Sequence, residues 1–258
     1  MHSEVKGLVL RTVDLKESDR LLTIFTEEQG IVTAMAKGAR SLKSRKMSST
    51  QQFCYSSFIL YEQGDKYWVK EASLIESFFG IRNSREGLAL AAYVVEVLND
   101  VGVEDKEVEL LRLALNALYA ISSEKYDLNK VKAVFEVRAM SILGFMPDVL
   151  ECHTCARRDG SFYFDIMAGA IECFDCHKRS EASHTTLSED HETHLISILT
   201  EGAKTAMCYA IYSPLEKMLA FNIPKEDMEL FCKAAERYVV NHLERSYKAL
   251  EFYNEVKR

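Results

Sequence analysis

Residues 20–36 read RLLTIFTEEQGIVTAMA and predict a β-hairpin in the N-terminal part of this 258-residue chain. Two apolar runs, residues 20–26 and 31–36, flank a short polar link that ends in Gly30. Glycine adopts positive φ without steric cost, so a link of this kind is typical of a turn between antiparallel strands.

Three further strands are predicted on either side of this hairpin. Residues 5–13 are apolar and rich in β-branched side chains, and residues 53–61 and 66–75 are separated by a polar link that contains Gly64. Five short strands within the first 75 residues favour a small closed barrel, and the five-stranded OB-fold is one such barrel. An SH3-like barrel would produce a similar pattern, so the pattern alone leaves that choice open.

Beyond residue 80 the hydrophobic period becomes helical. Apolar side chains between Val108 and Leu118 recur at steps of three and four residues. Asp127 is a suitable N-cap for a helix that ends near Leu143, because Gly144 stands where a C′ glycine is favoured and Pro147 blocks continuation.

Two more helices are expected near the C-terminus. One begins at Ser188 and ends at Gly202, and a long one begins at Pro224. The fold class is therefore α+β: an N-terminal five-stranded OB-fold barrel, then an all-α domain with an inserted four-cysteine zinc knuckle. The expected domains are 1–80 (barrel), 81–147 (first helical part), 148–183 (zinc-binding insert) and 184–258 (second helical part).

Four of the seven cysteines form two pairs with a two-residue gap, Cys152 with Cys155 and Cys173 with Cys176. Two such pairs match the spacing of a zinc ribbon or knuckle, in which four thiolates surround one Zn²⁺ tetrahedrally. Residues 161–166 and 170–171 can form a short hairpin that brings the pairs together. A complete four-cysteine site leaves no position for water, so we expect one structural Zn²⁺.

Other interpretations of this insert are weaker. Four buried cysteines without metal would show the same spacing, and His153 or His177 could replace a ligand. Redox activity is disfavoured because the pairs are expected in a loop and not in a strand-to-helix turn. Cys54, Cys208 and Cys232 fit apolar patterns and are expected in the core.

The charge distribution points to a local basic surface. The chain has 32 basic and 39 acidic residues, which argues against nucleic-acid binding over the whole surface. Residues 30–60 nevertheless contain no acidic residue, and five basic residues fall between positions 37 and 46: Lys37, Arg40, Lys43, Arg45 and Lys46. This basic loop, residues 37–46, favours phosphate binding, although a solvated loop would look the same. Aromatic residues on the neighbouring strands could stack on bases: Tyr55, Tyr61, Tyr67 and Trp68.

Several function classes are disfavoured. The sequence has no phosphate-binding loop, no dinucleotide-binding glycine motif and no nucleophile elbow, and we expect a protein that is not an enzyme. His191 and His194 lie three residues apart in a polar stretch and are expected to be solvated. No apolar run approaches the length of a membrane span, and no signal peptide is visible, so we expect a cytoplasmic, nucleoid-associated protein.

Taken together, the motifs resemble those of the RecO family of bacterial recombination mediators over nearly the whole chain. The resemblance lies in residues 7–11 and 17–26, in the basic loop, and in the LGFMP stretch at 143–147 that precedes the cysteine pairs. Ala156 departs from the family pattern, which commonly has glycine after the second cysteine.

The resemblance implies a function and a set of partners. RecO-like proteins bind single- and double-stranded DNA, anneal complementary strands, and with RecR help to load RecA onto strands coated by single-strand-binding protein, whose C-terminal tail they bind. We therefore expect Arg20 and the five basic residues of the loop to contact DNA, and Arg138 to lie at the rim of the tail-binding pocket. The alternatives are an RNA-binding or transcription-associated zinc protein, and a protein-interaction scaffold that does not bind DNA directly.

Overall fold

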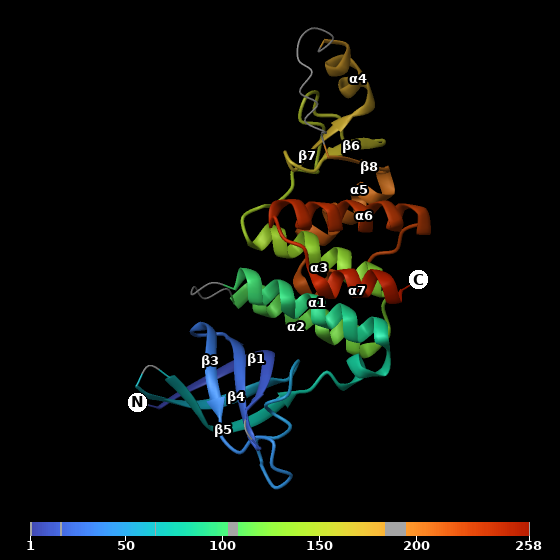
Figure 1. The fold of residues 1–258 in the computed structure, drawn as a ribbon. Helices are drawn as coiled ribbons and strands as arrows, with labels where there is room; N and C mark the ends of the chain where they lie inside the picture. The colour runs from blue at the N-terminus through green and yellow to red at the C-terminus, as the bar shows by residue number, and fades with distance from the viewer. Residues whose placement is uncertain (1, 16, 65, 103–107, 184–194, 258) are drawn as a thin grey trace. The chain divides into compact units, whose positions relative to one another are not determined.

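A computed structural model describes residues 2–15, 17–64, 66–102, 108–183 and 195–257. The chain forms two compact units (Figure 1). Unit 1 comprises residues 1–125 and 247–258, and unit 2 comprises residues 126–246. The chain therefore leaves unit 1 once and returns to it with its last helix. The boundaries predicted at residues 80, 147 and 183 remain predictions.

A closed five-stranded barrel opens unit 1. Its strands are β1 (His2–Leu15), β2 (Asp19–Thr26), β3 (Gly30–Ala36), β4 (Tyr55–Gln63) and β5 (Lys66–Glu76). The order around the barrel is β1-β2-β3-β5-β4, with β4 pairing back to β1 and with β3 parallel to β5. This closure is that of an OB-fold, so the predicted fold class is confirmed and the SH3-like alternative is removed.

Alternation along the strands produces the barrel core. Apolar side chains that point inward at every second position of the strands fill the interior. Ala39 of the basic loop joins them. The core residues are Val5, Val9, Leu22, Ile24, Val32, Ala34, Ala36, Ala39, Phe58, Leu60 and Val69. Gly30 and Gly64 both have positive φ, near 64° and 62°, in the β2–β3 and β4–β5 links. The two predicted hairpin turns are therefore confirmed.

Four helical segments complete unit 1: η1 (Phe79–Asn83), α1 (Arg85–Val101), α2 (Val108–Ser123) and α7 (Lys248–Val256). The hydroxyl of Ser84 accepts the backbone N–H of Gly87 and caps α1. Helix α7 packs along α1, where a carboxylate oxygen of Glu96 accepts the backbone N–H of Ala249 and Asp100 accepts the hydroxyl of Tyr247. These contacts attach the C-terminal segment to unit 1.

Unit 2 combines a helical layer with a small sheet. Its elements are α3 (Leu128–Ile142), β6 (Phe162–Asp165), β7 (Ala170–Cys173), α4 (Phe174–Ser183), β8 (Ile196–Leu199), α5 (Glu201–Tyr212), η2 (Leu215–Lys217) and α6 (Lys225–His242). Strand β6 lies between β7 and β8 and is antiparallel to both. The predicted hairpin between the two cysteine pairs is therefore confirmed.

Helix α3 begins and ends as predicted. The carboxylate of Asp127 accepts the backbone N–H of Lys130 at the N-cap. At the other end Gly144 has φ near 90°, its N–H donates to Ser141, and the N–H of Phe145 donates to Met140. This pair of hydrogen bonds is a Schellman motif, and Gly144 occupies its left-handed position.

The helix predicted from Ser188 to Gly202 is wrong in its second half. Residues 184–194, including Ser188, His191 and His194, lie outside the described residues; strand β8 follows them, and α5 starts only at Glu201. Gly202 lies in the first turn of α5. A side chain at this position would clash with Asp227, because a Cβ at position 202 would lie 2.0 Å from a carboxylate oxygen of Asp227. The glycine marks a close approach and not a helix end.

No helix in the part of the chain that the structure describes is both long and apolar enough to cross a membrane.

Candidate metal centre and nucleic-acid interface

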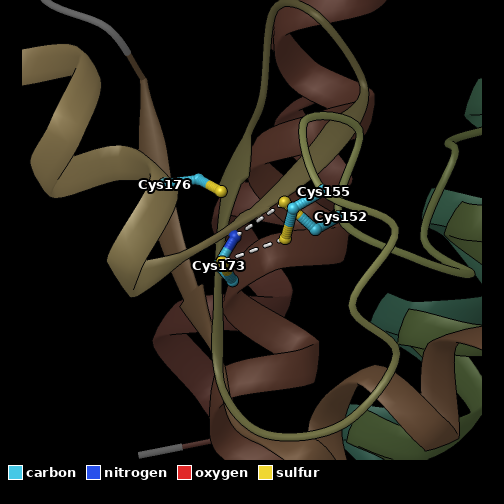
Figure 2. A group of neighbouring side chains, drawn as sticks. All are labelled: Cys152, Cys155, Cys173 and Cys176. Atoms are coloured by element: carbon cyan, nitrogen blue, oxygen red, sulfur yellow. Dashed lines mark hydrogen bonds between the residues drawn. The ribbon is translucent and has the colours of Figure 1, made fainter.

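The structure brings the four predicted cysteine ligands together. The Sγ atoms of Cys152, Cys155, Cys173 and Cys176 all lie within 4.8 Å of one another (Figure 2). The Sγ atoms of Cys155 and Cys173 are 3.7 Å apart. Zinc–thiolate bonds of about 2.3 Å in a tetrahedron place sulfur atoms about 3.8 Å apart. The four thiolates therefore fit a tetrahedral metal ion such as Zn²⁺.

A tight backbone turn positions the first pair. The N–H of Cys152 donates to Arg157, and the N–H of Ala156 donates to the carbonyl of Cys152, both at 2.8 Å. Ala156 has φ near 56°, in the left-handed region that favours glycine. The residue that departs from the family pattern thus occupies a strained position within the turn.

The second pair sits where β7 joins α4. Cys173 is the last residue of β7, and Cys176 lies in the first turn of α4. The expectation of a loop for both pairs is therefore wrong for this one, because a strand-to-helix turn carries it. The sulfur atoms of the first pair lie against this turn, however, and complete a four-sulfur cluster.

Nearby donors polarise the cluster. The backbone N–H of Cys173 donates to the Sγ of Cys152 at 3.3 Å, and the guanidinium of Arg179 donates to the Sγ of Cys176 at 2.9 Å. Burial raises the pKa of Cys152, but backbone N–H donors outweigh it and bring that pKa to about 6. Burial, followed by hydrogen bonds with the neighbouring cysteines, raises the pKa of Cys176 to about 12. The thiol of Cys152 therefore loses its proton readily, whereas a metal ion that binds here would have to displace the proton of the Cys176 thiol.

The two histidines beside the pairs contact a carboxylate and not the sulfur cluster. Nδ1 of His177 lies 3.1 Å from one oxygen of Glu172, and Nε2 of His153 lies 3.9 Å from the other. Both rings thus lie beside the sulfur cluster, and neither takes the place of a cysteine in it. The sequence alone did not indicate the contact between Arg179 and Cys176, because only the helical register of α4 places Arg179 one turn from Cys176.

The basic loop is a chain of tight turns. Hydrogen bonds from the N–H of one residue to the carbonyl three residues earlier close turns at 36–39, 38–41, 41–44 and 44–47, with N···O distances of 3.4, 3.2, 2.8 and 3.3 Å. Each turn has at least one basic residue at a central position. The exposed basic side chains are Lys37, Arg40, Lys43 and Arg45.

Acidic residues of the β1–β2 hairpin anchor this loop. The carboxylate of Asp19 accepts the N–H of Gly38 at 2.8 Å, and the N–H of Arg40 donates to the carbonyl of Ser18 at 2.9 Å. Asp14 forms ion pairs with Arg20 at 3.1 Å and with Arg40 at 3.2 Å. The sequence pattern missed these anchors because they lie about twenty residues before their partners.

Two of the six predicted DNA-binding residues brace the barrel itself. The guanidinium of Arg20 also donates to the carbonyl of Thr50 at 3.2 Å. The ammonium of Lys46 donates to the carbonyl of Val69 at 3.3 Å, and burial lowers the pKa of Lys46 although Asp19 partly opposes this. A phosphate would have to share these two groups with the protein, and would share the exposed guanidinium of Arg40 with Asp14. The side chains of Lys37, Lys43 and Arg45 are exposed to solvent.

The aromatic residues divide into two kinds. Tyr61 and Trp68 lie opposite each other on β4 and β5 and stack, with ring centroids 6.5 Å apart and planes at 19°. The hydroxyl of Tyr55 donates to Glu27, and burial with this contact raises the pKa of Tyr55. Tyr67 packs against the barrel core. Tyr61 and Trp68 are therefore the better candidates for stacking on bases.

Arg138, the predicted rim residue, is engaged within unit 2. Its Nη1 donates to the carbonyl of Ala210 at 3.1 Å and to that of Ile211, at the C-terminal end of α5. A cation at this position satisfies carbonyls that lack helical partners and complements the negative end of the helix dipole. Arg138 thus has a structural role, and rim binding remains a proposal.

Comparison with known proteins identifies the family. The model for the N-terminal part of recombination protein O matches residues 1–78, and the model for its C-terminal part matches residues 82–193. The chain belongs to the RecO family. A DNA repair protein RecO from Acetivibrio thermocellus is 34% identical over 258 residues, covering 99% of this chain and 97% of that protein.

Other RecO proteins also align over most of the chain. The protein from Caldanaerobacter subterraneus is 25% identical over 96% of both chains, and that from Clostridium kluyveri is 31% identical over 72% of this chain and 74% of its own. The resemblance inferred from the sequence is therefore confirmed. Membership of RecO places this chain among proteins of DNA repair and recombination.

Proposed function

We propose that this protein is a non-enzymatic recombination mediator that binds single- and double-stranded DNA through unit 1 and anneals complementary strands. The observation that carries the proposal is the anchored basic loop, whose successive turns present four exposed cations on an OB-fold barrel. Barrels of this type bind single strands by combining a basic track with stacking aromatic side chains.

The chemistry of annealing needs only binding. Lysine and arginine side chains neutralise phosphates and release counterions, which lowers the repulsion between two strands held close together. Phosphate contacts do not read sequence, so any complementary pair can be accommodated. Base pairing then supplies the free energy, and no nucleotide hydrolysis is required. A location in the cytoplasm at the nucleoid follows from such a role.

We assign the protein partners to surfaces other than the basic loop. The proposal includes RecR, joint loading of RecA, and capture of the acidic C-terminal tail of single-strand-binding protein. Residues 81–258 carry 21 basic and 29 acidic residues, and this excess of negative charge disfavours DNA there. Because the guanidinium of Arg138 already contacts α5, a bound tail would have to share it.

The four-cysteine cluster supports one structural Zn²⁺ as cofactor. Cys152, Cys155, Cys173 and Cys176 would occupy all four positions of a tetrahedral ion and leave none for water. The metal would tie the turn at residues 152–157 to the β7–α4 junction. Its role is to hold this part of unit 2 folded, not to take part in chemistry.

A strand-annealing assay tests the function. Two complementary labelled oligonucleotides are mixed with the protein and the rate of duplex formation is followed by energy transfer. The wild type should accelerate annealing, and a triple variant with Lys37, Arg40 and Lys43 changed to Glu should not. A matched variant with Lys217, Lys225 and Lys233 changed to Glu carries the same charge change on exposed positions of unit 2 and should retain the activity.

Two rival functions give different results in this assay. Strong competition by unlabelled RNA over DNA of the same sequence would favour an RNA-binding protein, because preference for RNA requires recognition of the 2′-hydroxyl. Absence of binding and annealing at low salt would favour a protein-interaction scaffold.

A further inference from the structure

Leu42 occupies an unusual position in the basic loop. Its side chain is 91% exposed, more than any other large apolar side chain in the described parts of the chain; Phe79 follows at 71%. Exposing a leucine this completely forgoes the free energy of burying it. Within residues 37–46 it is the single large apolar side chain among five basic ones.

The backbone holds Leu42 in a defined place. Leu42 and Lys43 are the central residues of the turn that the Ser44 N–H closes onto Ser41 at 2.8 Å. The loop is anchored before this turn by the bond from Gly38 to Asp19. After it, the hydroxyl of Ser49 contacts the carbonyls of Lys46 and Ala72. A side chain presented on a fixed turn loses little conformational entropy when it binds.

The surroundings of Leu42 indicate the chemistry of its ligand. Arg40, Lys43 and Arg45 are exposed within three residues on either side. A ligand that fits must therefore offer an apolar surface flanked by negative charges. Single-stranded DNA has this pattern, because flat base faces alternate with phosphates along the strand. Leucine is among the side chains that proteins insert between neighbouring bases.

We propose that Leu42 is an apolar wedge that enters between two neighbouring bases of bound DNA while Arg40 and Lys43 contact the flanking phosphates. This inference rests on the proposed DNA-binding function of the same loop. Insertion unstacks one base step without reading its sequence. Bases separated in this way present their pairing edges, which links the wedge to annealing.

The test uses single-stranded oligonucleotides that contain 2-aminopurine, whose fluorescence rises when the base is unstacked. Saturating wild-type protein should raise the fluorescence, and Leu42→Ala should remove at least half of the rise. Affinity at a fixed salt concentration should fall about tenfold, because the buried apolar area is lost. The dependence of affinity on salt should not change, because the basic residues remain.

Two control variants make the result specific. Leu42→Met keeps a long apolar side chain and should retain most of the fluorescence rise. Leu88→Ala removes a 43% exposed leucine from helix α1 and should behave as wild type. Neither Leu42 variant should alter thermal stability, because position 42 contributes little burial.

The outcomes separate the wedge from the function on which it rests. Salt-sensitive binding with the same fluorescence rise in wild type and Leu42→Ala would overturn the wedge and leave DNA binding intact. Such a result would assign the exposed leucine to a protein partner. A wild type that fails to bind the oligonucleotide at low salt would overturn both proposals.

Discussion

Two neighbouring lysines of the basic loop serve different purposes in this structure. Lys43 is exposed at a turn, whereas the ammonium of Lys46 is half-buried against the carbonyl of Val69. Sequence alone could not separate them, since both are lysines within one polar stretch. The distinction depends on β5, which lies more than twenty residues further along the chain.

We predict that Lys43→Met and Lys46→Met have opposite signatures. Lys43→Met should reduce the salt slope of single-strand binding by about 0.7, the value of one phosphate contact, and leave stability unchanged. Lys46→Met should leave the slope unchanged and lower the free energy of unfolding by about 1 kcal/mol, because the Val69 carbonyl loses its donor. Anisotropy and denaturant titrations measure the two quantities. Equal losses of slope would show that Lys46 also contacts phosphate.

Strain at Ala156 gives a second prediction. A non-glycine residue at φ near 56° is disfavoured, so Ala156→Gly should raise the free energy of unfolding of the zinc-loaded protein by about 0.5–1 kcal/mol. Ala168→Gly, in the nearby β6–β7 turn with an ordinary φ, should lower it by a similar amount. Denaturant titration of both variants is the measurement, and destabilisation by Ala156→Gly would contradict the account.

At the scale of elements, α3 and α6 are joined by a buried charge cluster. The ammonium of Lys132, only 1% exposed, lies 2.8 Å from Glu136 on its own helix and 2.9 Å from Glu236 on α6. Burial alone would lower the pKa of Lys132, but the two carboxylates outweigh it and hold this pKa above its ordinary value. The charged form is therefore the one that stabilises the folded state.

Removing this lysine should be costly. Lys132→Met removes the ammonium that faces the buried carboxylate of Glu136 and should lower the free energy of unfolding by about 3–5 kcal/mol. The double variant that also carries Glu136→Leu should recover much of the loss. A double variant no more stable than the single one would contradict this pairing.

The same cluster sets a pH dependence. Because the folded-state pKa of Lys132 is raised, its contribution should be complete below about pH 10.4, the ordinary lysine value, and should fall as the pH rises through the higher folded-state pKa. Above neutral pH, the difference in free energy of unfolding between wild type and Lys132→Met should therefore stay constant until strongly alkaline solution, where it should narrow.

Elements with strong local signals were predictable from the sequence. The barrel strands alternate clearly, Gly30 supplies a turn, and helix α3 carries both of its caps. Strand β8 was not predictable, because its four residues form a strand only by pairing with the edge of β6. Gly202 resembles a helix end in the sequence because glycine is favoured both at a C-terminal cap and where another side chain, here Asp227, approaches closely.

The four-cysteine cluster was also predictable from a local signal. The spacing of its cysteines is local, so two gaps of two residues define the site without knowledge of the fold. The anchors of the basic loop depend instead on contacts between β1, β2 and β5. The sequence therefore indicated the four-cysteine cluster more fully than the contacts that anchor the basic loop.

At the scale of the whole molecule, we predict that zinc stabilises unit 2 and not the barrel. The purified protein should carry about one zinc per chain, and Cys176→Ser should lose it, because one of four ligands is removed. Hydrogen exchange should then quicken in the segments around 148–179 while β1–β5 stay protected. Cys232→Ser is the control, since the Cys232 Sγ donates to the carbonyl of Asn129 and lies outside the cluster. Metal-free protein with unchanged exchange would contradict a structural zinc.

The distribution of charge matters more for function than its total. The whole chain is acidic, with a formal net charge of −7, yet residues 1–80 carry 11 basic and 10 acidic side chains. DNA binding is thus expected on a small part of the surface, where exposed cations are gathered on one anchored loop.

The most direct test of this account is the anisotropy of a labelled single-stranded oligonucleotide, titrated with protein over a series of salt concentrations. Four exposed cations at about 0.7 each predict a log–log slope of about −2.8 for the wild type. The variant with Lys37, Arg40 and Lys43 changed to Glu should lose most of this slope and of its affinity, and the matched unit 2 variant should keep both. Tight binding with an unchanged slope in the loop variant would contradict the assignment of the DNA-binding surface to this loop.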